Sequence, residues 1–185
     1  MVEHIASATI DDLWALPSDV HAELIRGEIV EMAPTGTPHG NLSASIHLVI
    51  GPFIKANKLG KSYIAETGFI LFDNPPTVRV PDVAFVRQDR LNLDTGTFFP
   101  GPPDLAVEVV SPSDRADDIN GKINQYLEAG TLEVWVVYPS DRSMMIFTPD
   151  ETRRLTGADQ LDRSAALPGL SVQVSALLDY YGEEQ

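Results

Sequence analysis

The sequence predicts a mixed α/β protein in which a β-sheet is flanked by helices. Short segments rich in β-branched and aromatic residues recur between residues 22 and 147, and several of them alternate between apolar and polar side chains. Two longer segments, 37–58 and about 117–129, carry apolar residues at helical spacing. With 185 residues, 43% of them hydrophobic, the chain is expected to form one domain spanning residues 1–185.

The first part of the chain is expected to supply a short helix, a hairpin and a long helix. Residues 9–16, TIDDLWAL, predict the short helix, with Thr9 as its N-cap. In segment 21–34 the Arg26-Gly27 step joins two short alternating runs, which predicts an N-terminal β-hairpin. Segment 37–58 follows as the long helix.

The second part is expected to alternate strands with one helix, which Gly130 closes. In chain order, the sequence predicts β-rich segments at 61–72 and 77–86, a long loop at 87–103, a strand at 104–110, the helix at about 117–129, and strands at 132–139 and 143–149. The tail from residue 164 is expected to be irregular and to end in a short helix.

Composition excludes several classes of protein. The formal net charge of -14 argues against broad, sequence-independent binding of nucleic acid, although a local basic or metal-charged site stays compatible with it. The chain has no cysteine, so disulfides and thiolate chemistry are excluded. We expect no signal peptide and no transmembrane helix, and therefore a cytoplasmic protein.

The strand PPDLAVEVVSPSD, residues 102–114, places a carboxylate in an unexpected position. Alternation puts Leu105, Val107 and Val109 on one face and Glu108 on the other, in mid-strand. A buried carboxylate costs free energy unless it is paired. Glu108 therefore needs a partner, either a metal ion or a cation such as Arg79 or Arg115.

Three residues together indicate a candidate metal-binding catalytic site. Asp82 opens the segment PDVAFV, Glu108 lies in mid-strand, and Lys122 lies in the helix that follows. Carboxylates are hard oxygen ligands suited to Mg²⁺ or Mn²⁺. Lys122 falls beside the apolar stripe of Ile119 and Tyr126, so it must extend toward solvent or meet an anion such as Glu108.

These residues resemble a known family. Asp82 in VPDVAFV, Glu108 in DLAVEVVSPSD, Lys122 followed by YLEAG, and EVWVV at 133–137 are similar to the bacterial Uma family, long described as a domain of unknown function and as restriction-endonuclease-like. The resemblance spans residues 22–139 and implies the PD-(D/E)XK nuclease superfamily. It implies a restriction-endonuclease-like mixed sheet flanked by helices, with Asp82 and Glu108 as metal ligands.

One position departs from the superfamily pattern. The motif would place a lysine two residues after Glu108, where this chain has Val110. The resemblance implies that the following helix supplies the lysine, and the helical stripe points independently to Lys122.

Three more residues are candidates for the site. Glu23 could supply a further acid or be a charge at the edge of the hairpin. His39 could touch a substrate phosphate at a helix N-terminus or serve as a hydrogen-bonded cap. Gln125 lies close to Lys122 on the helix and could line the same cleft. Asp104 faces the same side as Glu108 but lies about 13 Å away by strand rise, too far to share a metal.

The leading hypothesis is a Mg²⁺- or Mn²⁺-dependent endonuclease acting on nucleic acid, most simply DNA. In it Asp82 and Glu108 hold the metal and Lys122 assists. A second hypothesis is a catalytically weak binding module with the same fold, in a mobile-element or defence system. A third is a structural homodimer whose acids form interchain ion pairs. Under the first hypothesis a homodimer is also expected, because cutting two strands needs two sites.

Overall fold

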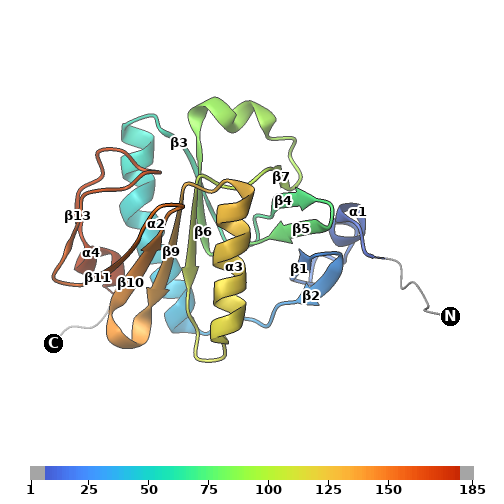
Figure 1. Ribbon diagram of the computed structural model, residues 1–185, viewed down its shortest axis with the longest axis horizontal. Coiled ribbons are helices and arrows are strands. Elements are labelled where there is room, and N and C mark those ends of the chain that lie inside the picture. Colours follow the sequence, from blue (N-terminus) through green and yellow to red (C-terminus); the bar gives the residue numbers. More distant parts are fainter. Residues whose placement is uncertain (1–6, 180–185) are drawn as a thin grey trace.

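The computed structural model describes residues 7–179 and is built on two main β-sheets (Figure 1). The larger sheet has six strands in the order β11-β10-β9-β8-β6-β3, and the smaller has five in the order β2-β1-β5-β4-β7. In the six-stranded sheet β8 and β9 run parallel, whereas the other neighbours are antiparallel. The predicted mixed α/β architecture with flanking helices is confirmed.

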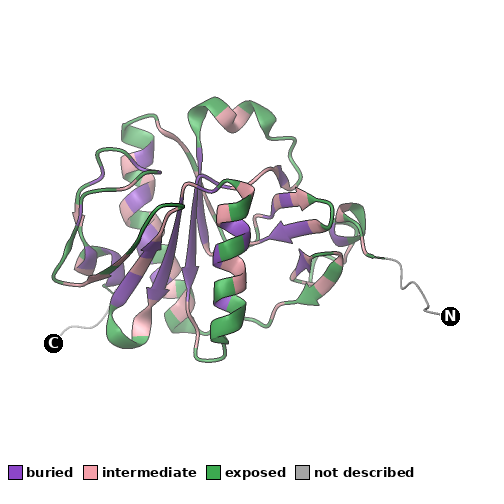
Figure 2. Ribbon diagram, in the orientation of Figure 1, coloured by how far each residue is buried: buried purple, intermediate pink, exposed green. Residues whose placement is uncertain are grey.

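The six-stranded sheet forms the centre of the molecule. Its middle strands are purple along their length in Figure 2, because they are covered on both faces. All five residues of β8 are buried, which explains why its sequence is almost continuously apolar. The strands of this sheet are β3 (Gly60–Ile64), β6 (Val83–Arg87), β8 (Leu105–Val109), β9 (Glu133–Tyr138), β10 (Ser143–Phe147) and β11 (Thr152–Thr156).

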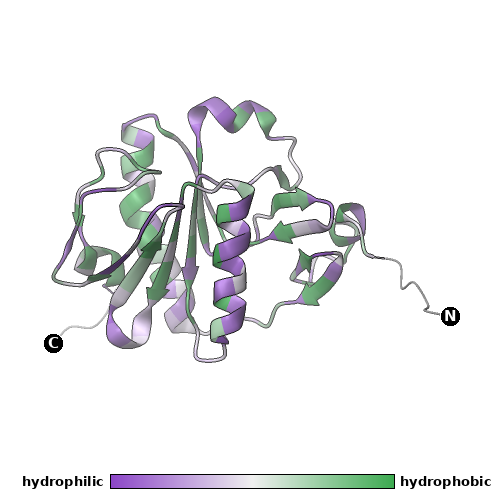
Figure 3. Cartoon of the chain, in the orientation of Figure 1, coloured by the Kyte–Doolittle hydropathy of each residue, from purple (hydrophilic) through white to green (hydrophobic). Residues whose placement is uncertain are grey.

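Two helices cover opposite faces of this sheet. Helix α2 (Thr37–Ala56) packs on the face formed by Val107 and its alternate neighbours, and α3 (Ala116–Ala129) packs on the face of Ala106. Gly130 ends α3 in the left-handed conformation, with φ 104°, as predicted. Figure 3 shows hydrophilic residues along the outward side of α3. Glu108 lies on the α3 face, because it shares its strand parity with Ala106.

The smaller sheet carries the predicted hairpin. Strands β1 and β2 pair antiparallel around Arg26 and Gly27, whose φ values of 52° and 84° are those of a type I′ turn. Helix α1 (Ile10–Trp14) lies against this sheet, capped by Thr9 as predicted. The strands are β1 (Ala22–Ile25), β2 (Glu28–Glu31), β4 (Phe69–Asp73), β5 (Pro76–Arg79) and β7 (Phe99–Pro100).

The two predicted β-rich segments each divide between the sheets, which the sequence did not indicate. Segment 61–72 supplies β3 and β4, and segment 77–86 supplies β5 and β6. Pro81 has no N–H to donate to a ladder, so the second segment breaks there and crosses between the sheets. This crossing places Asp82 at the start of β6, beside the smaller sheet.

The remaining segments contain more structure than the sequence predicted. The expected loop at 87–103 holds the 3₁₀ helix η1 (Gln88–Leu93) and β7. Its short strand was missed because two residues carry no periodicity. The short helix predicted for the tail is α4 (Val174–Leu178), and β12 (Gln160–Leu161) pairs with β13 (Val172–Gln173) just before it. No helix within residues 7–179 is long and apolar enough to cross a membrane.

Candidate active site

Asp82 and Glu108 face each other across two neighbouring strands. Val83 pairs with Val107 in the antiparallel ladder of β6 and β8, so one further step places Asp82 opposite Glu108. Directly opposed residues have Cβ atoms about 5 Å apart. The structure therefore brings together the two acids that the sequence singled out.

The Glu108 carboxylate has two side-chain donors, both from α3. The Lys122 ammonium donates to Oε2 at 2.8 Å, and the Tyr126 hydroxyl donates to Oε1 at 2.9 Å. The expected contact between Lys122 and Glu108 is thus present. The alternative in which Arg79 or Arg115 pairs with Glu108 is wrong: the Arg79 guanidinium binds Glu23 and Gln125, and among residues 7–179 Arg115 makes no ion pair with Glu108.

Glu23, Arg79 and Gln125 form a second buried layer beside this pair. Arg79 donates from Nη1 to Glu23 Oε2 at 2.6 Å and from Nε to Gln125 Oε1 at 2.7 Å. Glu23 Oε1 accepts the Val80 N–H at 2.9 Å and lies 4.0 Å from Lys122 Nζ. Strand β1 lies between β2 and β5, so Glu23 is not an edge charge. The layer joins the smaller sheet to α3 at the site.

His39 reaches Asp82 from the opposite side of the larger sheet. It lies in the first turn of α2, and its Nε2 is 3.2 Å from Asp82 Oδ2. The same oxygen accepts the Val109 N–H at 2.7 Å. The hydrogen bond to Asp82 raises the pKa of His39 against the effect of burial, and the Asp82 charge and the Val109 main chain add to the increase.

Negative charge exceeds positive charge in this cluster. Glu23, Asp82 and Glu108 are three acids, whereas Arg79 and Lys122 are its two permanent cations. Burial, opposed by the charge of Lys122 and assisted by those of Asp82 and Glu23, raises the pKa of Glu108 to about 7.

Burial and the same carboxylates also shift the pKa values of Lys122 and Tyr126. Burial lowers the pKa of Lys122, but the charges of Glu108 and Glu23 outweigh burial and raise it above the usual lysine value. Burial and the neighbouring carboxylates raise the pKa of Tyr126 well above its ordinary value. Both groups are therefore held protonated, as hydrogen-bond donors to Glu108.

The donor set fits a hard divalent cation. Asp82 and Glu108 offer carboxylate oxygens from adjacent strands, and each carboxylate has more acceptor positions than its donors occupy. Across the part of the chain that the structure describes, no three His, Asp or Glu side chains form a cluster that could hold a metal. Mg²⁺ commonly binds through one or two carboxylates, several waters and substrate phosphate, so two carboxylates suffice.

The sequence did not predict the role of Tyr126 or the partners of Arg79. It placed Tyr126 in the apolar stripe, yet its hydroxyl contacts Glu108. The spacing of four from Lys122 placed Tyr126 on the same helix face, but no local pattern showed that its hydroxyl meets Glu108. The bond from Arg79 to Gln125 spans 46 residues, and no local pattern could have shown it.

The comparisons with known proteins first define the class of fold. A crystal structure of a putative nuclease belonging to DUF820, from Anabaena variabilis ATCC 29413, superposes with a TM-score of 0.78. It is 19% identical, and the match covers 92% of this chain and 97% of that one. The chain therefore has a nuclease-like fold.

The family follows from the sequence comparison. The family model Uma2, described as putative restriction endonuclease, matches residues 10–175, and the chain belongs to this family. No curated protein sequence matches the chain. The resemblance noted from Asp82, Glu108 and Lys122 is confirmed at the level of the family.

Proposed function

We propose that this chain is a metal-dependent endonuclease that hydrolyses phosphodiester bonds of DNA. The observation that carries the proposal is the meeting of Asp82 and Glu108 on adjacent strands, with the Lys122 ammonium 2.8 Å from Glu108. Membership of the Uma2 family and the nuclease-like fold support it. Asp82 and Glu108 would hold Mg²⁺ or Mn²⁺.

The chain's own residues hold the two carboxylates in place. When bound, the ion would supply Lewis-acid stabilisation of the phosphate and a more acidic water. The Val109 N–H and His39 fix the orientation of Asp82, and Tyr126 fixes that of Glu108. Hydrolysis forms a bond from the water oxygen to phosphorus and breaks the bond to the leaving oxygen, which then takes a proton.

Lys122 acts as a source of positive charge and not as a base. Its raised pKa keeps the amine protonated while Glu108 and Glu23 are ionised. A protonated ammonium can stabilise negative charge that develops on the phosphate oxygens, whereas it cannot accept a proton from water. Glu23 and Gln125 hold positions beside this ammonium, and Arg79 fixes both of them.

The test is cleavage of supercoiled plasmid with Mg²⁺ or Mn²⁺, together with calorimetric titration of Mn²⁺. Asp82→Ala should lose cleavage and Mn²⁺ binding. Lys122→Met should lose cleavage by roughly a hundredfold or more but bind Mn²⁺ at least as tightly, because a competing cation is gone. The exposed Asp117→Asn serves as a control. Intact plasmid with both metals and no saturable Mn²⁺ binding would sink the proposal.

The binding module is the second candidate function. Both Glu108 oxygens already accept hydrogen bonds, and the side chain is only 5% exposed, which favours a structural ion pair. Metal-independent DNA binding by the unsubstituted protein, with no cleavage and no saturable Mn²⁺ binding, would support the module over the enzyme.

The proposed cytoplasmic nuclease is also expected to act as a homodimer, since cutting both strands of a duplex takes two sites. Light scattering coupled to gel filtration measures the oligomeric state. A monomer that still makes double-strand breaks would remove this part of the proposal.

A further inference from the structure

The longest acid-free stretch of this acidic chain is residues 32–65. No Asp or Glu occurs between Glu31 and Glu66, although the chain has 27 of them and a formal net charge of -14. The charged residues of the segment are Lys55, Lys58 and Lys61. The segment folds into α2 and β3, so the absence of acids marks one continuous part of the structure.

Both elements connect the candidate active site to the lysines. Helix α2 begins beside Asp82, which His39 contacts, and its 20 residues extend about 30 Å to its far end at Lys55. Figure 1 shows α2 rising from the lower to the upper end of the larger sheet, where the chain turns into β3. Strand β3 then returns toward the site, and its Ile64 pairs with Val83, next to Asp82.

The outer surface of these elements is open and uncharged between the site and the lysines. The exposed side of α2 presents residues spaced by three or four, which form one ridge: Gly40, Ala44, Leu48, Pro52 and Lys55. Strand β3 is an edge strand, because it is hydrogen-bonded only to β6 in the six-stranded sheet. Nothing on this ridge would repel a polyanion.

The three lysines have no partner that explains them. Lys55, Lys58 and Lys61 are exposed, and their side chains make no ion pair or hydrogen bond with residues 7–179. Lys55 lies in the last turn of α2 and complements the helix dipole. Lys58 and Lys61 lie beyond the helix, so the dipole does not account for them.

We propose that this surface, the exposed side of α2 and β3 with Lys55, Lys58 and Lys61, binds the sugar–phosphate backbone of the nucleic acid whose scissile phosphate lies at Asp82 and Glu108. The inference rests on the proposed nuclease function and adds where its substrate lies. Lysines that bind phosphates release counterions, and these three lie in the longest acid-free stretch of a polyanionic chain. Its length of about 30 Å corresponds to roughly nine phosphates of one strand.

The test compares two triple variants of equal charge in a Glu108→Gln background, which prevents cleavage during binding. The test variant is Lys55→Gln, Lys58→Gln, Lys61→Gln. The control is Arg142→Gln, Arg154→Gln, Arg163→Gln, exposed residues in and around β10 and β11, at the opposite edge of the sheet from β3. Fluorescence anisotropy measures binding to labelled duplex and single-stranded DNA of one sequence between 50 and about 200 mM salt.

The test variant should bind DNA at least about tenfold more weakly at the lower salt. The slope of its log affinity against log salt should fall by the amount expected for the loss of about two to three phosphate contacts. The control should stay within about threefold of the parent, because its charges lie far from the surface. Equal loss in both triples, or no DNA binding by the parent, overturns the inference. The inference is also overturned if the lysine triple loses binding to phosphatidylserine vesicles but not to DNA, since the partner would then be a membrane.

The same two triple variants are also made with Glu108 intact. Plasmid cleavage by these proteins separates this inference from the proposed function. If the lysine triple loses DNA binding but the protein with Glu108 intact does not cleave plasmid, the binding surface is supported and the nuclease function is refuted. Cleavage that the lysine triple leaves unchanged keeps the nuclease and removes the surface.

Discussion

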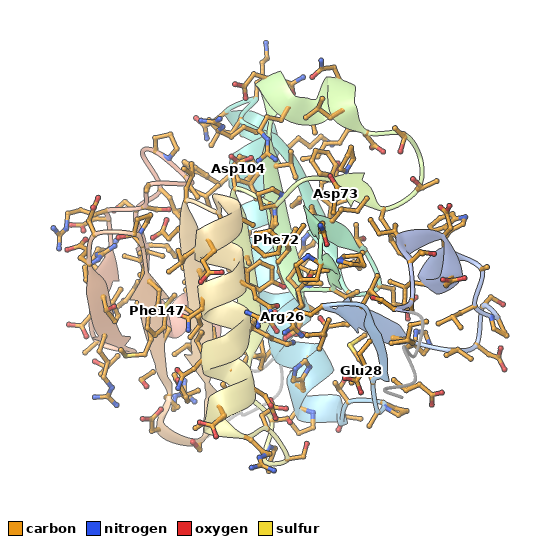
Figure 4. The ribbon with its side chains drawn as sticks, turned by 45° about the vertical axis from the view of Figure 1, so that its right-hand side comes forward. Arg26, Glu28, Phe72, Asp73, Asp104 and Phe147 are labelled. Atoms are coloured by element: carbon orange, nitrogen blue, oxygen red, sulfur yellow. The ribbon has the colours of Figure 1, made fainter. Side chains whose placement is uncertain are left out.

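Strand β8 carries two buried acids on the same face, and their surroundings differ. Asp104 lies just before the strand and Glu108 lies near its end, with residue exposures of 2% and 3%. Figure 4 labels Asp104 at the upper end of α3, near the C-terminal end of that helix. Burial alone would make the two acids equivalent.

Asp104 is fully neutralised by two arginines. Its carboxylate lies 3.2 Å from Arg87 Nε and 3.0 Å from Arg90 Nη1, and it accepts the Arg87 N–H at 2.8 Å. Arg90 also donates to the Pro102 carbonyl. This acid ties η1 and the preceding strand to β8, which is a structural role.

Glu108 has one ammonium and one hydroxyl as donors, and two further acids nearby, Asp82 and Glu23. Its three acids exceed the two permanent cations of its cluster, whereas at Asp104 two arginines balance Asp104 and the exposed Asp89, which lies 3.6 Å from Arg87 Nε. A buried acid is thus a candidate for metal binding when its neighbours leave it under-neutralised, and not merely because it is buried.

The largest effect should come from replacing Glu108. Glu108→Gln keeps the shape of the side chain and an oxygen that accepts from Lys122 or Tyr126, so the protein should stay folded. Cleavage should fall by roughly a thousandfold, since a metal-binding charge is lost. Plasmid cleavage and thermal unfolding measure the two properties. If Glu108→Gln unfolds the protein but leaves the activity of each folded molecule unchanged, Glu108 has a structural role like that of Asp104.

Asp104→Asn should produce the opposite result. Arg90 would lose its anionic partner and Arg87 the buried one of its two, and because both arginines are partly exposed we expect a loss of about 2 kcal/mol in the free energy of unfolding. Activity of the folded protein should be nearly unchanged. Urea denaturation provides the measurement, and the control is Asp89→Asn, which removes the exposed partner of the same Arg87. A cleavage defect at full stability would contradict the structural role.

The pH dependence of metal binding should report the under-neutralised acid. Below its pKa of about 7 Glu108 carries a proton that a metal must displace, so Mn²⁺ affinity should rise about tenfold per pH unit up to pH 7 and level off above pH 8. Loss of the proton from His39, whose pKa is also raised, acts in the same direction. Calorimetry between pH 5.5 and 8.5 tests this, and an affinity that is flat between pH 6 and 8 would refute it.

The smallest effect should come from the Tyr126 hydroxyl. Tyr126→Phe leaves Glu108 Oε1 without its donor, so the protein should lose about 1 kcal/mol of stability and a few-fold of activity. The matched control is Tyr63→Phe, because the buried Tyr63 hydroxyl has no hydrogen-bond partner among the described residues. Equal effects of both variants would show that the hydroxyl of Tyr126 does not orient Glu108.

Local patterns predicted much of this fold. The hairpin turn at Arg26-Gly27, the helix that ends at Gly130 and the parity of β8 all depend on residues close in sequence. The division of segments 61–72 and 77–86 between two sheets was not predicted, because strand partners are chosen by contacts far along the chain. The same distinction holds at the site. The contact of Lys122 with Glu108 spans 14 residues and was anticipated, whereas the bond from Arg79 to Glu23 spans 56 and was not.

By itself the sequence determined which side chains are forced toward the interior. A period of two residues placed Glu108 on a covered strand face, and a period of 3.6 placed Lys122 beside a buried stripe, since both periods follow from backbone geometry alone. Only the tertiary structure decided which acids share a site and how their charge is balanced. Charge balance is a sum over neighbours from several elements, and the packing of β1, β5, β6 and α3 around Glu108 assembles those neighbours.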